Sequence, residues 1–125
     1  MRCIQILLLS VLVISPPAWA QGLTGPQQNA VRSAKLYLSV QGFSRSGLIR
    51  QLSSEFGDGY SVSDATVAVD SLKINWDDQS VRSAQLYLSI QGFSCRGLIQ
   101  QLSSSAGDGY TESQARYGAQ RAGAC

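Results

Sequence analysis

The segment LYLSVQGFSRSGLIRQL at residues 36–52 returns 50 residues later as LYLSIQGFSCRGLIQQL at residues 86–102. The repetition extends outward from this segment, and residues 31–65 are identical to residues 81–115 at 25 of 35 positions. Self-similarity at a fixed period is typical of a duplicated folding unit. We therefore expect two copies of one small domain, the first over residues 21–75 and the second over residues 76–125.

Apolar residues recur at helical spacing in both copies, which predicts an all-α fold with three helices in each copy. We expect the first helix to begin at Pro26, or at Trp76 in the second copy, because proline suits the first helical turn. Gly42 is expected to end this helix in a left-handed cap. Ser44 and Ser94 then cap the second helices. Such short corners indicate a helix-turn-helix-like unit, and units of ~50 residues are marginal alone, so the two copies should pack together.

The third helix has a larger apolar face in the first copy than in the second. In the first copy the expected inner face is Val62, Ala65, Val69 and Leu72, and in the second it is Ala115, Ala119 and Ala122. The second copy therefore needs another source of stability.

Two cysteines in the second copy supply a candidate for that source. Cys95 stands where the first copy has Arg45, and Cys125 stands where it has Asn75. If the second and third helices are antiparallel, these positions lie side by side. We predict a Cys95–Cys125 disulfide that closes a loop of ~30 residues and contributes ~3–4 kcal/mol on the chain-entropy model. The alternative is a reactive or intermolecular thiol.

Residues 1–20 have the pattern of a secretory signal peptide. The apolar run over residues 4–14 is too short for a membrane span, which takes ~20 residues. Small residues precede an expected cleavage site between Ala20 and Gln21. Because Gln21 is not the cysteine that a lipoprotein carries after cleavage, we expect no lipid anchor. The mature protein should be exported to the periplasm, the cell envelope or the medium, in proximity to the membrane.

The residue types argue against an enzyme, a metal site or a cofactor. The chain contains no histidine, the commonest general base and metal ligand, and its serines have no adjacent base. Asp58 and Asp108 lie between glycines, but the other oxygen ligands of a calcium loop are missing. Without residues 1–20 the chain has nine basic and eight acidic residues, and its arginines are spread out, which argues against a nucleic-acid partner.

With both copies in view, the sequence resembles the Ltp-like repeat of host cell surface-exposed lipoproteins, found in phages, prophages and bacterial genomes. The resemblance rests on FSRSGLIRQL at residues 43–52, preceded by Ala34-x-x-Tyr37-Leu38, and on FSCRGLIQQL at residues 93–102. It covers essentially all of the mature chain. It implies tandem helix-turn-helix units outside the cytoplasm. In phage members it implies superinfection exclusion, in which the protein engages the tape-measure protein or another injection component and blocks DNA injection.

The sequence departs from this family pattern at two places. It lacks the lipid-bearing cysteine, and its second copy has Cys95-Arg96 where the motif has Arg-x. The first copy is therefore expected to carry the recognition of a protein partner, through Arg32, Arg45, Arg50 and Tyr60 as candidate contacts. A general periplasmic or secreted interaction module with a host envelope partner is the alternative function.

Overall fold

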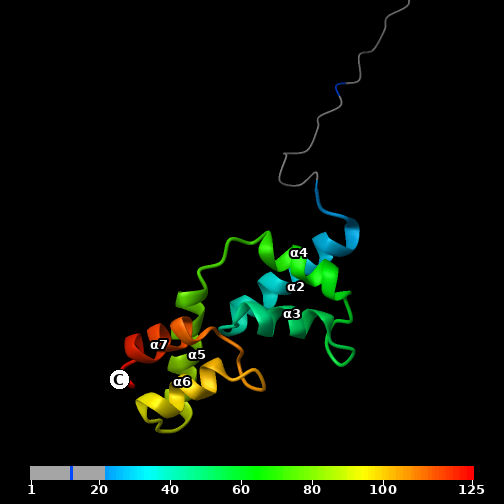
Figure 1. The fold of residues 1–125 in the computed structure, drawn as a ribbon. Coiled ribbons are helices and arrows are strands. Elements are labelled where there is room, and N and C mark those ends of the chain that lie inside the picture. The colour runs from blue at the N-terminus through cyan, green and yellow to red at the C-terminus, as the bar shows by residue number, and fades with distance from the viewer. Residues whose placement is uncertain (1–11, 13–21) are drawn as a thin grey trace, which may run out of the picture.

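The computed structural model describes residue 12 and residues 22–125, and the regular structure of this part is entirely helical (Figure 1). The helices are α2 (Gly25–Val40), α3 (Arg45–Ser53), α4 (Val62–Asp70), α5 (Trp76–Ile90), α6 (Cys95–Ser103) and α7 (Glu112–Arg121). Helices α2 to α4 form the first repeat and α5 to α7 the second, which confirms the all-α tandem fold. The expected signal peptide and its cleavage site, Ala20 and Gln21, lie outside the described residues. Among the helices that are described, none has the length and apolar character needed to cross a membrane.

A short polar side chain caps the start of each of these six helices by accepting the backbone N–H three residues on. The caps are Thr24, Ser44, Ser61, Asn75, Ser94 and Thr111. Thr24 and Gln27 form a reciprocal capping box, which satisfies two otherwise unpaired N–H groups. Because of this box, α2 begins at Gly25 and Pro26 is its second residue, so the predicted start is wrong by one position.

Gly42 does not form the left-handed cap that its position suggests. The chain leaves α2 at Gln41 in an extended conformation, with φ −154°, and the glycines with positive φ are Gly59, Gly109 and Gly123. A Cβ atom on Gly42 would instead lie 2.6 Å from the carbonyl oxygen of Gln79 in the second repeat. Glycine is needed here because the backbone of another helix approaches closely.

Each repeat has its own apolar core, built around a pair of leucines on its second helix. Leu48 and Leu52 are fully buried in the first repeat, as are their counterparts Leu98 and Leu102 in the second. Val62, expected on the inner face of α4, is 64% exposed. It is the first residue of α4 and lies outside the core cluster, so this prediction is wrong.

Small residues let the first and third helices of each repeat cross closely. In the second repeat a Cβ on Gly118 of α7 would lie 2.6 Å from Ser80 Oγ and 2.7 Å from the Ser80 carbonyl oxygen. The Ser80 hydroxyl donates to the carbonyl oxygen of Gln114 at 2.7 Å. The corresponding residues of the first repeat, Ala30 and Ala68, are fully buried.

The start of the second helix is tied to the end of the third in both repeats, by different chemistry. In the first repeat Arg45 donates from Nε and Nη2 to the two carboxylate oxygens of Asp70, at 2.7 and 2.8 Å. In the second repeat the structure contains the predicted disulfide, with the Cα atoms of Cys95 and Cys125 4.7 Å apart. Both ties start from equivalent positions, Arg45 and Cys95, although Asp70 and Cys125 are not equivalent. We call these two ties the two staples.

Candidate functional site

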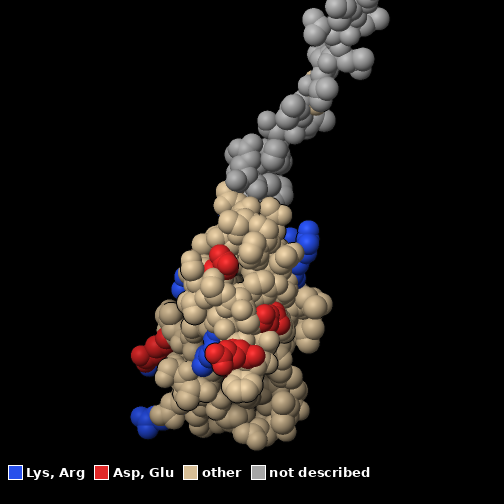
Figure 2. Space-filling model, turned by 90° about the vertical axis from the view of Figure 1, so that its right-hand side faces the viewer, with Lys and Arg blue, Asp and Glu red and all other residues tan. Residues whose placement is uncertain are grey.

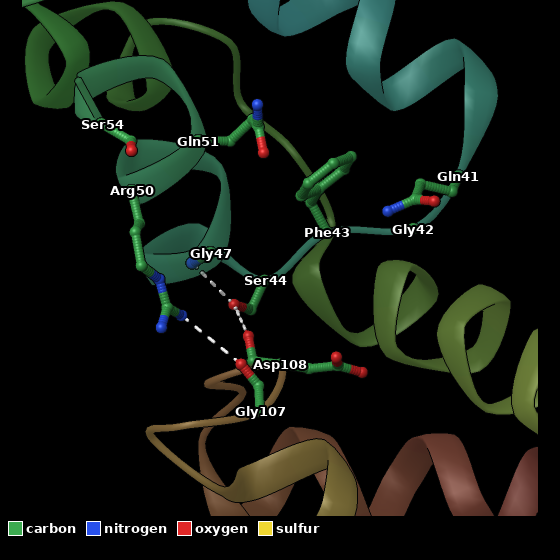
Figure 3. A pocket seen from close by; sticks show the side chains of 10 residues that line it. All are labelled: Gln41, Gly42, Phe43, Ser44, Gly47, Arg50, Gln51, Ser54, Gly107 and Asp108. Atoms are coloured by element: carbon green, nitrogen blue, oxygen red, sulfur yellow. Dashed lines mark hydrogen bonds between the residues drawn. The ribbon is translucent and has the colours of Figure 1, made fainter. Parts of the chain in front are cut away.

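The two repeats meet through different parts of each unit. The first repeat contributes the start of α3 and the corner that precedes it, and the second repeat contributes its α6–α7 loop and the side of α5 (Figures 1 and 3). This joint is therefore head-to-tail, since the same surface is not used twice.

Two hydroxyls at the start of α3 bind backbone oxygens of the α6–α7 loop. Ser44 Oγ donates to the carbonyl oxygen of Asp108, and Ser46 Oγ donates to that of Gly109 at 2.8 Å. Ser44 is only 2% exposed although it also caps α3. A Cβ on Gly47 would lie 3.1 Å from the same Asp108 oxygen, so the loop rests directly on the helix start.

Arg50, one turn further along α3, extends the contact to the beginning of the loop. Its Nη1 donates to the carbonyl oxygen of Ser105 at 3.0 Å, and its Nη2 donates to that of Gly107 at 3.5 Å. In Figure 3 its guanidinium reaches down to the loop, while the Asp108 carboxylate is turned away from it. Arg50 thus fixes the loop mainly through its backbone.

A second set of contacts joins the first-repeat corner to α5. Arg82 Nη1 donates to the carbonyl oxygen of Leu38 at 2.7 Å and to Gln79 Oε1 at 3.1 Å. The same Gln79 oxygen accepts from the backbone N–H of Phe43 at 3.4 Å. Gly42 lies between these contacts, which explains why no side chain fits there.

The α6–α7 loop is held in shape by its own repeat. The Tyr87 hydroxyl donates to Asp108 Oδ1 at 2.8 Å and accepts from Gln101 Nε2 at 3.1 Å. Burial raises the pKa of Asp108, against the lowering effects of the Tyr87 hydrogen bond and the Arg50 charge. Gly109, with φ 71°, supplies the left-handed turn. The loop therefore presents its carbonyl oxygens as fixed acceptors.

A groove of about 350 Å³ opens at the joint (Figure 3). Its lining is Gln41, Gly42, Phe43, Ser44, Gly47, Arg50, Gln51, Ser54, Gly107 and Asp108. Amides, hydroxyls and one aromatic ring can bind a polar segment of a partner. Within the described part of the chain, no group of three histidine, cysteine or acidic residues is arranged to hold a metal ion.

The four candidate contacts do not form one site in this structure. Arg45 pairs with Asp70, Arg50 lies in the joint, and the Tyr60 hydroxyl is 3.2 Å from Ser33 Oγ within the first repeat. Arg32 is exposed on α2 and donates to Asn29 Oδ1 at 3.1 Å. Figure 2 likewise shows acidic and basic side chains scattered over one face, with no gathering of one sign. Their role in partner binding stays a prediction.

Sequence reasoning missed the joint, although one signal for it was present. Positions 46 and 50 differ between the copies, with Arg96 and Gln100 in the second, inside a segment that is otherwise nearly identical. The joint is asymmetric, so equivalent positions of the two copies serve different surroundings. A difference inside a well-kept repeat can thus mark an interface between repeats.

Comparison with known proteins agrees with this architecture. The model of the family of host cell surface-exposed lipoproteins matches residues 26–72 and 75–120, one segment for each repeat. Comparison with curated proteins gives no significant match. Among solved structures, the chain is similar to Ltp, a superinfection exclusion protein from the Streptococcus thermophilus temperate phage TP-J34. The TM-score is 0.70 and the sequence identity 28%, over 78% of this chain and 96% of that one.

The family description bears on where the protein lies. It speaks of exposure on the host cell surface, which agrees with the expected location in the cell envelope. It also speaks of lipoproteins, so the expected lack of a lipid anchor stays a prediction. Two matched segments that together span most of the chain, each laid over one three-helix repeat, lead to one assignment. The chain belongs to the Ltp family of host cell surface-exposed lipoproteins.

Proposed function

We propose that this protein is a binding protein of the cell envelope that excludes superinfecting phage by blocking the injection of phage DNA. The observation that carries the proposal is the likeness of both repeats, in tandem, to a superinfection exclusion protein, over 96% of that protein's chain. Exclusion by binding needs a stable surface rather than a catalytic centre. Two stapled repeats locked by backbone acceptors supply such a surface.

The partner we propose is a protein of the injection machinery, such as a tape-measure protein. The groove at the joint suits a protein segment because its amides and hydroxyls, from Gln41, Gln51 and Ser54, can pair with peptide groups. The ring of Phe43 adds an apolar contact beside them. Neither a nucleic acid nor a cofactor has a part in this proposal.

An infection assay tests this function directly. Cells that make the full chain are compared with cells that make a variant lacking residues 1–20, across a panel of unrelated phages. We expect unchanged adsorption and reduced DNA injection with the full chain for at least one phage, and normal infection with the truncated variant. Equal infection of both strains by every phage would refute the proposal. Recovery of a host envelope partner in that case would favour a general interaction module.

We also propose that the mature protein acts without a lipid anchor, because Gln21 follows the expected cleavage site. Labelling of producing cells with radioactive palmitate should leave the protein unlabelled. Its intact mass should correspond to a chain that starts at Gln21. Incorporation of palmitate, or a mass increased by acyl chains, would contradict this part of the proposal.

A further inference from the structure

The head-to-tail joint uses only one loop and one corner, although the duplicated chain has two of each. The first repeat keeps a free α3–α4 loop over residues 55–59, all of them exposed. The second repeat keeps a free corner over residues 91–94. Since the two repeats are alike, these free parts correspond to the two sides of the existing joint.

The free loop already has the shape of the bound one. Gly57 and Gly59 donate their N–H groups to the carbonyl oxygen of Ser54 at 3.0 Å each, as Gly107 and Gly109 do to that of Ser104. Gly59 and Gly109 have the same φ of 71°. The Tyr37 hydroxyl holds Asp58 at 2.7 Å, as Tyr87 holds Asp108. The loop needs no rearrangement before it accepts hydrogen bonds.

Arg32 repeats half of the contact that Arg82 makes in the joint. Each arginine donates from Nη1 to an amide oxygen three residues earlier, at 3.1 Å in both cases, which is Asn29 for Arg32 and Gln79 for Arg82. Arg82 also donates to the carbonyl oxygen of Leu38 on the facing corner, whereas Arg32 is exposed. The guanidinium of Arg32 is therefore accessible to an equivalent carbonyl oxygen from another molecule.

The free corner of the second repeat has room for such a neighbour. A Cβ on Gly92 would meet nothing within 4 Å, whereas one on Gly42 would strike the α5 backbone. Ser94 is exposed, whereas Ser44, its counterpart, is covered by the loop. Gly92 is thus unexplained by the packing of the single chain but fits the close approach that Gly42 permits.

We propose that a second copy of this chain docks here, with the corner of its second repeat placed on Arg32 and the free loop of the first repeat. The leucine carbonyl that Arg32 would bind is that of Leu88, the counterpart of Leu38. The contact is a continuation of the existing joint. It does not depend on the proposed exclusion of phage.

The residues that differ between the copies are complementary in charge in this second joint. The docking helix start carries Arg96 in place of Ser46, and Gln100 in place of Arg50. The free loop carries Glu55 in place of Ser105, three residues before Asp58. Arg96 therefore brings a positive charge to a loop that carries one carboxylate more than the loop of the existing joint, so charge attraction favours this contact.

A head-to-tail contact of this kind leaves a free half at each end of an open assembly. Copies therefore add in a row unless the rotation from one copy to the next closes the row into a ring. Inside one chain the linker holds the two halves at an effective concentration of ~mM. Separate copies lack this help, so assembly is expected at high protein concentration or on a crowded surface.

Sedimentation velocity of the exported chain, from micromolar concentrations to ~1 mM, tests the proposal. The weight-average mass of the natural chain should rise with concentration. Gly92→Val blocks the free corner and Arg32→Ala weakens the free loop side, so each variant alone should stay monomeric. Lys35→Ala is the matched control, because it removes an exposed positive charge from the same helix and should assemble like the natural chain.

Mixing the two blocked variants gives the sharpest result. Arg32→Ala retains a free corner and Gly92→Val retains a free loop, so the mixture should form one-to-one dimers that grow no further. Thermal unfolding of each variant alone should match that of the natural chain, which shows that the fold is intact. A natural chain that stays monomeric at ~1 mM, assembly that persists in both variants, or a mixture without dimers would overturn the proposal.

Discussion

Tyr60 and Tyr110 occupy equivalent places in the two repeats, yet their hydroxyls have different surroundings. Tyr110 is 3% exposed. Its hydroxyl lies 2.6 Å from Ser83 Oγ and donates to the carbonyl oxygen of Gln79 at 2.9 Å. Burial raises its pKa well above the ordinary value for tyrosine. Tyr60 is half-buried, with one hydroxyl partner at 3.2 Å. Gly42 of the first-repeat corner lies against both partners of the Tyr110 hydroxyl, Gln79 and Ser83, so the joint covers this site and Tyr110 is a buried polar anchor.

Replacing these hydroxyls should have unequal effects on stability. Tyr110→Phe leaves the buried Ser83 hydroxyl without its partner and removes one bond to the Gln79 carbonyl oxygen, so it should lower the free energy of unfolding by about 1–2 kcal/mol. Tyr60→Phe should cost less than half as much, because water can replace its single bond. Urea unfolding followed by circular dichroism measures both. Equal losses of unfolding free energy in the two variants would show that the buried bonds of Tyr110 stabilise the fold no more than the bond of Tyr60.

Gly118 offers a second comparison at the scale of single residues. Gly118→Ala places a methyl group against the Ser80 backbone, so α5 and α7 must separate. We expect a loss of about 1–3 kcal/mol in unfolding free energy. Gly92→Ala, at a glycine with open space around its Cβ position, is the control and should change stability by at most about 0.5 kcal/mol. A tolerated Gly118→Ala would mean that the helix crossing is looser than described.

At the scale of helices, the two staples perform one task with different sensitivity. The Arg45–Asp70 pair is about half exposed on both sides, and an exposed pair contributes at most about 1 kcal/mol. The Cys95–Cys125 disulfide closes a loop over a separation of 30 residues, which corresponds to roughly 3–4 kcal/mol. The stronger staple belongs to the repeat whose third helix has the smaller apolar face.

Reduction and mutation should separate the two staples. Dithiothreitol should lower the melting temperature of the second repeat strongly, whereas Asp70→Asn should lower that of the first only slightly. Residue-resolved hydrogen exchange at increasing temperature assigns each loss to its repeat. A larger loss from Asp70→Asn than from reduction would contradict this ranking.

The first staple also predicts a dependence on pH. The hydrogen bond from Arg45 lowers the pKa of Asp70, so the folded state binds this proton less readily than the unfolded state. The stabilisation is present above the ordinary aspartate value of about 3.9 and is lost as the pH falls through the lower folded value. In unfolding titrations between neutral pH and pH ~2, Asp70→Asn should remove this part of the acid-induced loss. An unchanged acid profile would show that the pair is not coupled to stability.

Helix caps and the disulfide could be predicted because each depends on a local pattern or on one simple geometric assumption. The serine and threonine caps could be predicted because each lies three residues before the N–H group that it accepts. The predictions for Gly42 as a left-handed cap and for Val62 as a core residue are wrong for a common reason. The surroundings of both residues are set by parts of the molecule that are distant in sequence. The open side of α4 and the close approach of α5 exist only once the whole fold is formed.

At the scale of the whole molecule, all the described side chains that donate hydrogen bonds to the α6–α7 loop across the joint belong to the first repeat. Ser44, Ser46 and Arg50 bind carbonyl oxygens of the second repeat. The contact uses the backbone of the loop, so Ser105 can vary without loss of its acceptor, whereas Asp108 and Gly109 are needed because they hold the loop in shape. The differences at positions 46 and 50 mark the donor side of the joint in the sequence. The acceptor side could not be predicted, because every residue has a backbone carbonyl group.

Removing two of these donors should loosen the molecule without unfolding it. The double variant Ser46→Ala, Arg50→Ala should raise the radius of gyration measured by small-angle X-ray scattering, while helix content stays unchanged. Gln100→Ala, at the position equivalent to Arg50, is the control and should scatter like the natural chain under dilute conditions. An unaltered profile for the double variant would show that the α5 contacts alone hold the repeats.

The position of the disulfide also bears on the order in which the molecule is built during export. The first repeat contains no cysteine within residues 22–75, so its core can form without an oxidising enzyme. The second repeat is secured only after Cys125 has emerged, beyond the end of α7. A chain that is exported from its N-terminus would therefore fold the first repeat, with Ser44 and Arg50 at the joint surface, before the second. The second repeat would then place its α6–α7 loop on the folded first repeat before oxidation forms the disulfide.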